Sequence, residues 1–164
     1  MESIGIKRLL LMILLVLSGL SMMAQSAKDL EKGKEYWGKA QDAYRQKNNS
    51  ATFKYNKKSA ELGYPRGMLS LGVCYALGIG TQENSDLAVY WYKKAMKHPE
   101  DKWSYPRAFF NLAEHYVSGG GVTKDIAKAA QLFAQGINPF YFLLYLKLFL
   151  SQSLYIDYTN ILIV

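Results

Sequence analysis

The sequence has very little of the side-chain chemistry that catalysis, metal binding and disulfide bonding require. Cys74 is the only cysteine in 164 residues, and His98 and His115 are the only histidines. One thiol cannot form an internal disulfide, so packing must hold the fold together, and Cys74 is interpreted as a core thiol. The histidines have no Cys or His partner at ligand spacing, so we predict no metal, no cofactor and no enzymatic activity. Glu114 and His115 are interpreted as an exposed helix pair.

A concentrated basic patch is also lacking, although the net charge is +7. Residues 28–135 contain 17 Lys or Arg against 11 Asp or Glu, with both signs interspersed. The densest basic piece, Lys54, Lys57 and Lys58, has helical spacing and is typical of a solvated helix face. A nucleic-acid surface needs a larger patch, ideally with exposed aromatic residues, so no nucleic acid is expected. An acidic partner or an anionic envelope surface is the alternative.

The N-terminus has the pattern of a secretory signal peptide, which we assign to residues 1–24. Two basic residues at 7–8 precede an unbroken apolar run over residues 9–17. This run is about half of the roughly 18 residues that a membrane-spanning helix needs, so an uncleaved anchor is the lesser alternative. Cleavage is expected after Ala24 or Ala27. The mature protein is therefore expected to be exported, periplasmic or secreted, and bacterial.

One stretch of the sequence, from Tyr64 to Tyr92, occurs a second time from Tyr105 to Phe133. Every matching pair of residues is 41 positions apart. The pairs are Tyr64-Pro65-Arg66 with Tyr105-Pro106-Arg107, Leu71 with Leu112, Tyr75 with Tyr116, Gly78 and Gly80 with Gly119 and Gly121, Ala88 with Ala129, and Tyr92 with Phe133. A constant offset without gaps indicates a duplicated structural unit, here two helices around a glycine turn.

Residues 55–60 resemble residues 91–96 at an offset of 36. This resemblance indicates a third, degenerate copy of the unit before the two clear ones. We therefore predict an all-α fold, an α/α solenoid of about three helix-turn-helix repeats. The expected units are a degenerate tetratricopeptide-like repeat at 28–63 and clear repeats at 64–104 and 105–136.

Helix boundaries follow from local signals. Asn48-Asn49-Ser50 ends one helix and supplies the N-cap of the next, and Pro65 opens a helix in its first turn. Asn84 or Ser85 is expected to cap the second helix of the first clear repeat, and Thr123 the corresponding helix of the next.

Neighbouring helices are expected to approach closely at small residues. These are Gly67 and Gly72, with Ala108 and Ala113 in the next copy. The pattern is interrupted at Gly136, where the repeat calls for the equivalent of Ala95, and the last helix is expected to be cut off there.

These features resemble the Sel-one-like repeat, a subclass of the tetratricopeptide-like helical repeats, over about residues 30–136. The resemblance departs from the family pattern at Ala113 and Leu132, where Gly and Trp are usual. The residues that define the repeat are Leu71, Gly72, Tyr75, Gly78, Gly80, Ala88, Trp91, Tyr92, Ala108, Leu112, Tyr116, Gly119, Gly121, Ala129 and Phe133.

The resemblance implies a solenoid whose concave side recruits other proteins. The hypothesis is a non-catalytic scaffold or adaptor of the cell envelope, with Arg66, Ser70, Arg107 and Asn111 as the residues that contact a partner. The cysteine-rich branch of the family includes envelope proteins that bind β-lactam-like ligands. The absence of those cysteines argues against a β-lactam-interacting enzyme, which is kept as the rival interpretation.

The tail at residues 137–164 is strongly apolar and has only Lys147 and Asp157 as charged residues. Three interpretations compete. The tail is a membrane-associated segment that makes the protein an anchored adaptor, a helix that caps the last repeat, or the product of a frame error or truncated gene.

Overall fold

The computed structural model describes the backbone of residues 2–136 and the side chains of residues 12–136. These residues form six α-helices and no strand, which confirms the predicted all-α class. The tail at 137–164, with its three interpretations, lies outside the described residues. The helices are α1 (Glu2–Arg45), α2 (Asn49–Glu61), α3 (Pro65–Leu77), α4 (Ser85–Ala95), α5 (Ser104–Ser118) and α6 (Ile126–Gly136).

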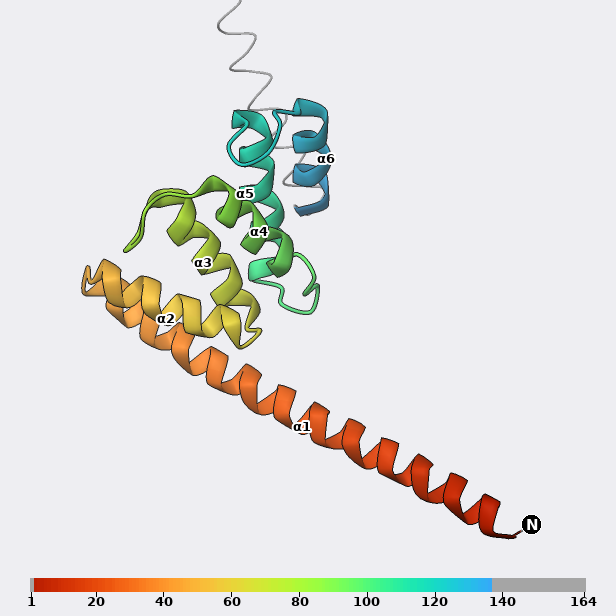
Figure 1. Ribbon diagram of the computed structural model, residues 1–164. Coiled ribbons are helices and arrows are strands. Elements are labelled where there is room, and N and C mark those ends of the chain that lie inside the picture. The colour runs from red at the N-terminus through yellow and green to blue at the C-terminus, as the bar shows by residue number, and fades with distance from the viewer. Residues whose placement is uncertain (1, 137–164) are drawn as a thin grey trace, which may run out of the picture.

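The helices pair into three hairpins, α1 with α2, α3 with α4 and α5 with α6, which stack along the molecule (Figure 1). Between hairpins, α2 packs on α3 and α4 packs on α5. The first helices also contact one another, α1 with α3 and α3 with α5, whereas α2 and α4 make no close backbone contact in the described part of the chain. The first helices therefore lie on the inner side of the stack, as a solenoid requires.

Helix α1 is far longer than the other helices, and its N-terminal half projects away from the stack (Figure 1). Apolar side chains on this half are exposed to solvent; for example, Leu14 is 65% and Met22 75% exposed. The backbone is helical without interruption through the expected cleavage sites at Ala24 and Ala27. Among the described residues, we find no helix with an apolar stretch that could cross a membrane. The signal peptide stays a prediction.

The core is built mainly of small and aliphatic side chains at the helix interfaces. Gly67 and Gly72 permit the close helix contacts that the sequence predicts. A Cβ on Gly67 would lie 2.6 Å from Ser59 Cβ of α2, and one on Gly72 would lie 2.5 Å from the ring of Tyr92 in α4. The largest buried side chains include Tyr92 and Leu71. Tyr92 thus packs against α3 only because residue 72 has no side chain.

The last helix, α6, includes Gly136, so the expected interruption at this position is wrong. Gly136 is buried, as Ala95 is in the preceding hairpin. A Cβ at this position would lie 2.6 Å from Phe109 Cβ and 2.9 Å from the carbonyl oxygen of Pro106. Glycine at 136 therefore serves a tight contact between α5 and α6.

Three of the four predicted helix starts are confirmed. The Asn48 and Asn84 side chains accept hydrogen bonds from the backbone N–H groups of Ala51 and Leu87, and Pro65 is the first residue of α3. The prediction for Thr123 is wrong. Helix α6 begins at Ile126, and Asp125 Oδ1 accepts a hydrogen bond of 2.8 Å from the Lys128 N–H. Asp125 is the residue 41 positions after Asn84, so the cap follows the repeat offset.

The two glycines of each turn have different functions. Gly78 ends α3 in the left-handed conformation, at φ +64°, where glycine avoids the steric cost of a side chain. Gly80, at φ +70°, touches the backbone of Asn49 at the start of α2 in the preceding hairpin. Gly119 and Gly121 repeat this arrangement, with Gly121 against Ser85 at the start of α4. The second glycine therefore sets the packing of one hairpin on the next.

Candidate functional site

A groove runs along the inner side of the stack, between the first helices of the hairpins. It consists of two adjoining hollows of about 430 and 380 Å³ that share Val73, Leu77 and Asn111. We call the two together the inner groove. Its lining residues are Gln41, Tyr44, Thr52, Asn56, Leu69, Ser70, Val73, Cys74, Ala76, Leu77, Ile79, Tyr92, Trp103, Arg107, Asn111, Glu114, His115 and Ser118.

The structure brings three of the four predicted contact residues together in this groove. Ser70 of α3 and Arg107 and Asn111 of α5 line the larger hollow. Arg66 does not line it but packs beside it. That these residues contact a partner stays a prediction, because the structure contains no partner.

The Arg66 guanidinium lies against two indole rings, 5.4 Å from the centre of Trp37 and 5.5 Å from that of Trp103, and the two ring centres are 5.8 Å apart in an edge contact. Its Nε donates a hydrogen bond of 3.1 Å to Asp101 Oδ2. Trp37 belongs to α1, Arg66 to α3 and Trp103 to the segment before α5, so this cluster connects all three hairpins. Sequence reasoning did not predict this structural role, because nothing local indicates which rings will meet.

Asp101 belongs to the same cluster and lies three residues before the start of α5. Its Oδ1 accepts hydrogen bonds of 2.9 Å from the backbone N–H groups of Trp103 and Ser104. Burial alone would raise the pKa of this carboxyl, but the two N–H groups and the Arg66 guanidinium outweigh burial and hold its pKa below the usual range. Asp101 is therefore an ionised partner that neutralises Arg66.

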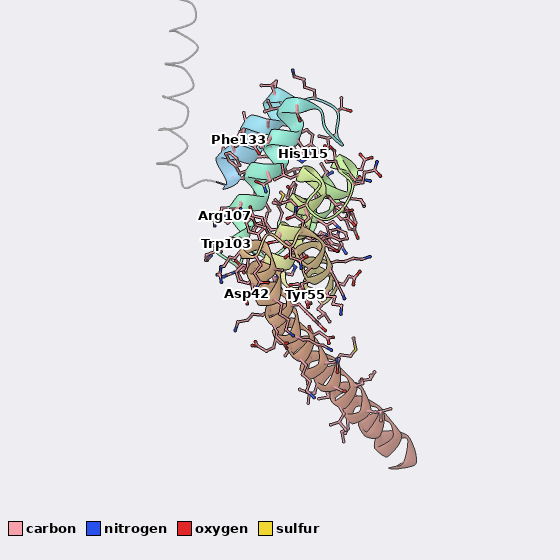
Figure 2. All side chains as sticks on the ribbon, turned by 90° about the vertical axis from the view of Figure 1, so that its left-hand side faces the viewer. Asp42, Tyr55, Trp103, Arg107, His115 and Phe133 are labelled. Atoms are coloured by element: carbon pink, nitrogen blue, oxygen red, sulfur yellow. The ribbon has the colours of Figure 1, made fainter. Side chains whose placement is uncertain are left out.

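Arg107 occupies the same position in the next repeat but has no such carboxylate among the described residues. Its guanidinium lies 4.5 Å from the centre of the Trp103 ring, and Nη1 donates a hydrogen bond of 2.8 Å to the Trp103 carbonyl oxygen. The side chain is exposed (Figure 2). Arg107 is thus a positioned cation at one end of the groove.

Ser70 connects the groove to α1. Trp37 Nε1 donates a hydrogen bond of 3.2 Å to Ser70 Oγ, and both residues are half-buried. Ser70 Oγ retains the capacity to donate its own hydrogen to a ligand.

The base of the groove contains the buried pair Asn56 and Cys74. Cys74 is 2% exposed, which confirms the predicted core thiol. Burial raises its pKa, although the Asn56 amide, which donates to Sγ at 3.5 Å, lowers it. Asn56 Oδ1 accepts no hydrogen bond from the described residues. Sequence reasoning missed Asn56, since its counterpart in the next repeat, at an offset of 36, is Tyr92.

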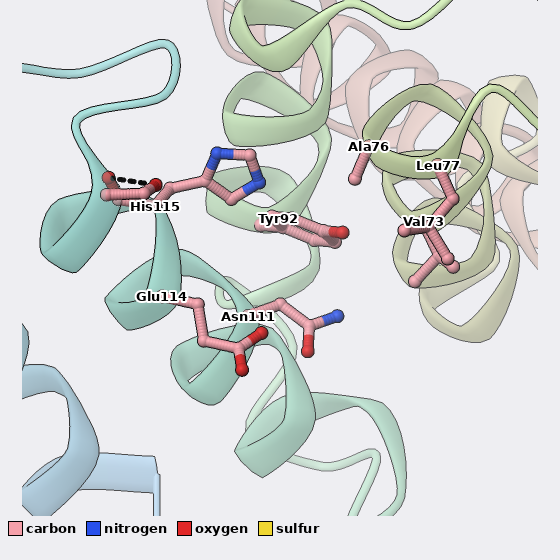
Figure 3. A pocket seen from close by; sticks show the side chains of 8 residues that line it. Val73, Ala76, Leu77, Tyr92, Asn111, Glu114 and His115 are labelled. Carbon is pink, nitrogen blue, oxygen red and sulfur yellow. Dashed lines mark hydrogen bonds between the residues drawn. The ribbon is translucent and has the colours of Figure 1, made fainter.

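The opposite end of the groove is formed by α3, α4 and α5 (Figure 3). In Figure 3, the Tyr92 ring lies between His115 on one side and Val73 and Ala76 on the other. Burial raises the pKa of the Tyr92 hydroxyl, against the lowering effect of its hydrogen bond with Asn111. A proton therefore stays on this hydroxyl at neutral pH.

The prediction of an exposed Glu114–His115 pair is wrong for the histidine. His115 is half-buried, its ring centre is 5.7 Å from that of Tyr92, and Nδ1 donates to the Gly120 carbonyl oxygen at 2.8 Å. The hydrogen bond from the His115 ring therefore holds the glycine turn after α5 against that helix. Glu114 is exposed and has no ion-pair partner among the described residues.

The described residues contain no group of three His, Cys, Asp or Glu side chains that could hold a metal ion. What the inner groove provides is a mixed surface of hydrogen-bonding, aromatic and aliphatic groups with a few charges. Such a surface can bind another molecule by contact.

Comparison with known proteins agrees with the repeat pattern. The Sel1 repeat family model matches residues 65–97 and residues 106–138. The comparison with curated proteins gave no match.

Two solved structures are similar to this chain. One is a Sel1 repeat protein from Oxalobacter formigenes, with a TM-score of 0.53 and 23% identity over 74% of this chain and 86% of that chain. The other is a protective antigen of uropathogenic Escherichia coli strains that displays an SLR fold, with a TM-score of 0.50 and 27% identity. That match covers 73% of this chain and 24% of the E. coli chain. Residues 65–97 and 106–138 therefore match the Sel1 repeat, and the described residues have the fold of Sel1-repeat proteins.

Proposed function

We propose that this protein is a non-catalytic scaffold of the bacterial cell envelope that binds a partner protein in the inner groove. Sel1-repeat proteins are generally protein-interaction scaffolds. The observation that carries the proposal for this chain is the convergence of Ser70, Arg107 and Asn111 in a single groove. These three residues come from two repeats, and only the stacking of α5 on α3 brings them together.

The composition of the groove supports binding by contact. Leu77 is 65% and Tyr44 56% exposed, and both line the groove beside hydrogen-bonding groups such as Asn111. Exposed apolar residues next to polar groups are characteristic of surfaces that a protein partner covers. Trp103 and Arg107 are residue types that often contribute most to binding free energy.

The proposed location in the envelope is supported by the basic and apolar pattern of residues 1–24. The test is the intact mass of the protein purified from its native source. We expect the mass of a chain that begins at residue 25 or 28. The mass of a chain that still contains residues 1–24 would contradict export by cleavage.

Binding in the groove is tested by affinity capture of the full-length protein from its native cells, with partners quantified by mass spectrometry. Arg107→Glu and Leu77→Glu place a negative charge in the groove at exposed positions. We expect each to reduce recovery of the specific partners about tenfold, since a contact worth about 1.4 kcal/mol changes affinity by that factor.

Two matched variants carry the same charge changes outside the groove. Lys93→Glu lies on the exposed face of α4, and Ile126→Glu is at the start of α6, where Ile126 is 56% exposed. Both are expected to retain the partners. Equal recovery by the groove variants and the control variants, all with unchanged circular dichroism spectra, contradicts binding in the inner groove.

A further inference from the structure

We propose that the inner groove selects a peptide segment that carries one acidic and one basic side chain. Both side chains lie on the same side of the segment, about 10 Å from each other. In this arrangement the carboxylate pairs with Arg107 and the cationic side chain pairs with Glu114. This inference rests on the proposed function and specifies the partner's chemistry.

The first support is that the charges of the groove are unpaired and opposite in sign. Arg107 and Glu114 are the only Lys, Arg, Asp or Glu residues among those that line it. Neither forms an ion pair within the described part of the chain. The nearby Arg66, by contrast, is already neutralised by Asp101 at 3.1 Å. The groove therefore presents one positive and one negative group to whatever binds.

The second support is the spacing of the two charges. Arg107 and Glu114 are seven residues apart on α5, which is almost two turns, so their side chains leave the same face of the helix. A rise of 1.5 Å per residue separates their Cα atoms by about 10.5 Å along the helix axis. A polyproline-II segment places residues three positions apart on the same side, about 9 Å from each other. A short extended segment can thus satisfy both charges at once.

The third support is the surface between the charges. Asn111 lies between Arg107 and Glu114 on α5, and Val73 and Leu77 of α3 form the facing wall (Figure 3). The segment's backbone can form hydrogen bonds with the Asn111 amide while an apolar side chain rests on Leu77. Arg107 is also held in place by its contact with Trp103, so it loses little freedom when a carboxylate binds.

The experiment uses the full chain and four fluorescein-labelled peptides of ten residues. Each has a proline-rich framework and two variable positions three residues apart, occupied by Asp and Lys, by two Asp, by two Lys, or by two Gln. Affinities are measured by fluorescence anisotropy. The unmodified protein is expected to bind the Asp and Lys peptide about fivefold more tightly than the Gln peptide, since two partly exposed ion pairs contribute modestly.

Single charge reversals are expected to change which peptide binds best. Arg107→Glu makes both ends of the groove acidic and should favour the peptide with two Lys. Glu114→Lys makes both ends basic and should favour the peptide with two Asp. The control variant Lys93→Glu should keep the preference for Asp with Lys. A gain of affinity for a new peptide cannot come from unfolding.

Three outcomes overturn the proposed charge pattern. They are equal affinity for the four peptides, no binding of the Asp and Lys peptide, and a peptide preference that the substitutions leave unchanged. A further variant, Asp157→Asn, removes the single acidic side chain of the tail at 137–164. Binding of the Asp and Lys peptide to this variant alone also overturns the proposal, because the tail of the chain itself would then be the occupant of the groove. These outcomes leave the proposed function standing, since partner capture tests that function separately.

Discussion

The two glycines of one turn should respond very differently to alanine, because only the second contacts the preceding hairpin. In Gly78→Ala the new Cβ meets the flexible Glu83 side chain, whose Cγ is 3.1 Å away. In Gly80→Ala it meets the backbone of Asn49, whose carbonyl carbon is 2.6 Å away, and Phe53 Cβ at 2.9 Å. That backbone begins α2 and is fixed by the Asn48 cap.

The magnitudes follow from two separate terms. Both glycines have positive φ, +64° and +70°, so alanine costs about 1 to 2 kcal/mol at either position. At Gly80 the overlap with fixed backbone adds about 1 to 3 kcal/mol, the usual cost of overpacking. We therefore expect Gly78→Ala to lower the free energy of unfolding by about 1 to 2 kcal/mol, and Gly80→Ala by about 2 to 5 kcal/mol.

The assay is urea unfolding followed by far-ultraviolet circular dichroism, with the slope against urea checked for constancy. Gly119→Ala and Gly121→Ala repeat the comparison in the next hairpin. There a Cβ on Gly119 would be 3.4 Å from Lys124 Cβ, and one on Gly121 would be 2.5 Å from the Ser85 carbonyl carbon. Equal losses within each pair would refute the conclusion that the second glycine sets the packing between hairpins.

Three further predictions concern single residues. Lys47 has φ +58° in the α1–α2 turn, where a side chain costs about 1 to 2 kcal/mol. Glycine loses more backbone entropy on folding, which offsets part of this gain, so Lys47→Gly should raise the free energy of unfolding by about 0.5 to 1 kcal/mol in the same urea assay. Asp101 has a lowered pKa, so its contribution is complete above the unfolded value near 3.8 and is lost as pH falls through the folded value. Asp101→Asn should therefore lower the melting temperature at pH 7 and flatten its decline below pH 4; an unchanged decline contradicts this. Cys74 is buried with a raised pKa, so iodoacetamide should modify it, by mass spectrometry, only in denaturant. Rapid labelling of the folded protein would contradict its placement.

The repeat offset made much of the fold predictable. Residues with local signals, such as the Asn48 cap and Gly78, were identified because their conformation depends on neighbours in the sequence. The small residues Gly67 and Gly72 were identified because two helices can approach only where side chains are absent. The Asp125 cap was missed in favour of Thr123, although the offset of 41 from Asn84 indicates it.

The details of the groove depend on contacts between distant segments, and these could not be predicted. Ser70, Arg107 and Asn111 were expected on the concave side from repeat geometry, and they do line one groove. Their contact with a partner stays a prediction. The position of Arg66 against two tryptophans and the burial of the Asn56 amide both result from the way the hairpins stack. Residues 18 to 35 positions apart in the sequence form hydrogen bonds there, and no local pattern indicates which residues will meet.

The central claim, that a partner occupies the inner groove, is tested most directly by photo-crosslinking in the native cells. Benzoylphenylalanine replaces Leu77, which is exposed in the groove, or Lys93, which is exposed on α4. The account predicts a specific protein adduct from position 77 that is absent from position 93. Adducts from position 93 without any from position 77 would contradict it, because the partner would then contact the outer helices.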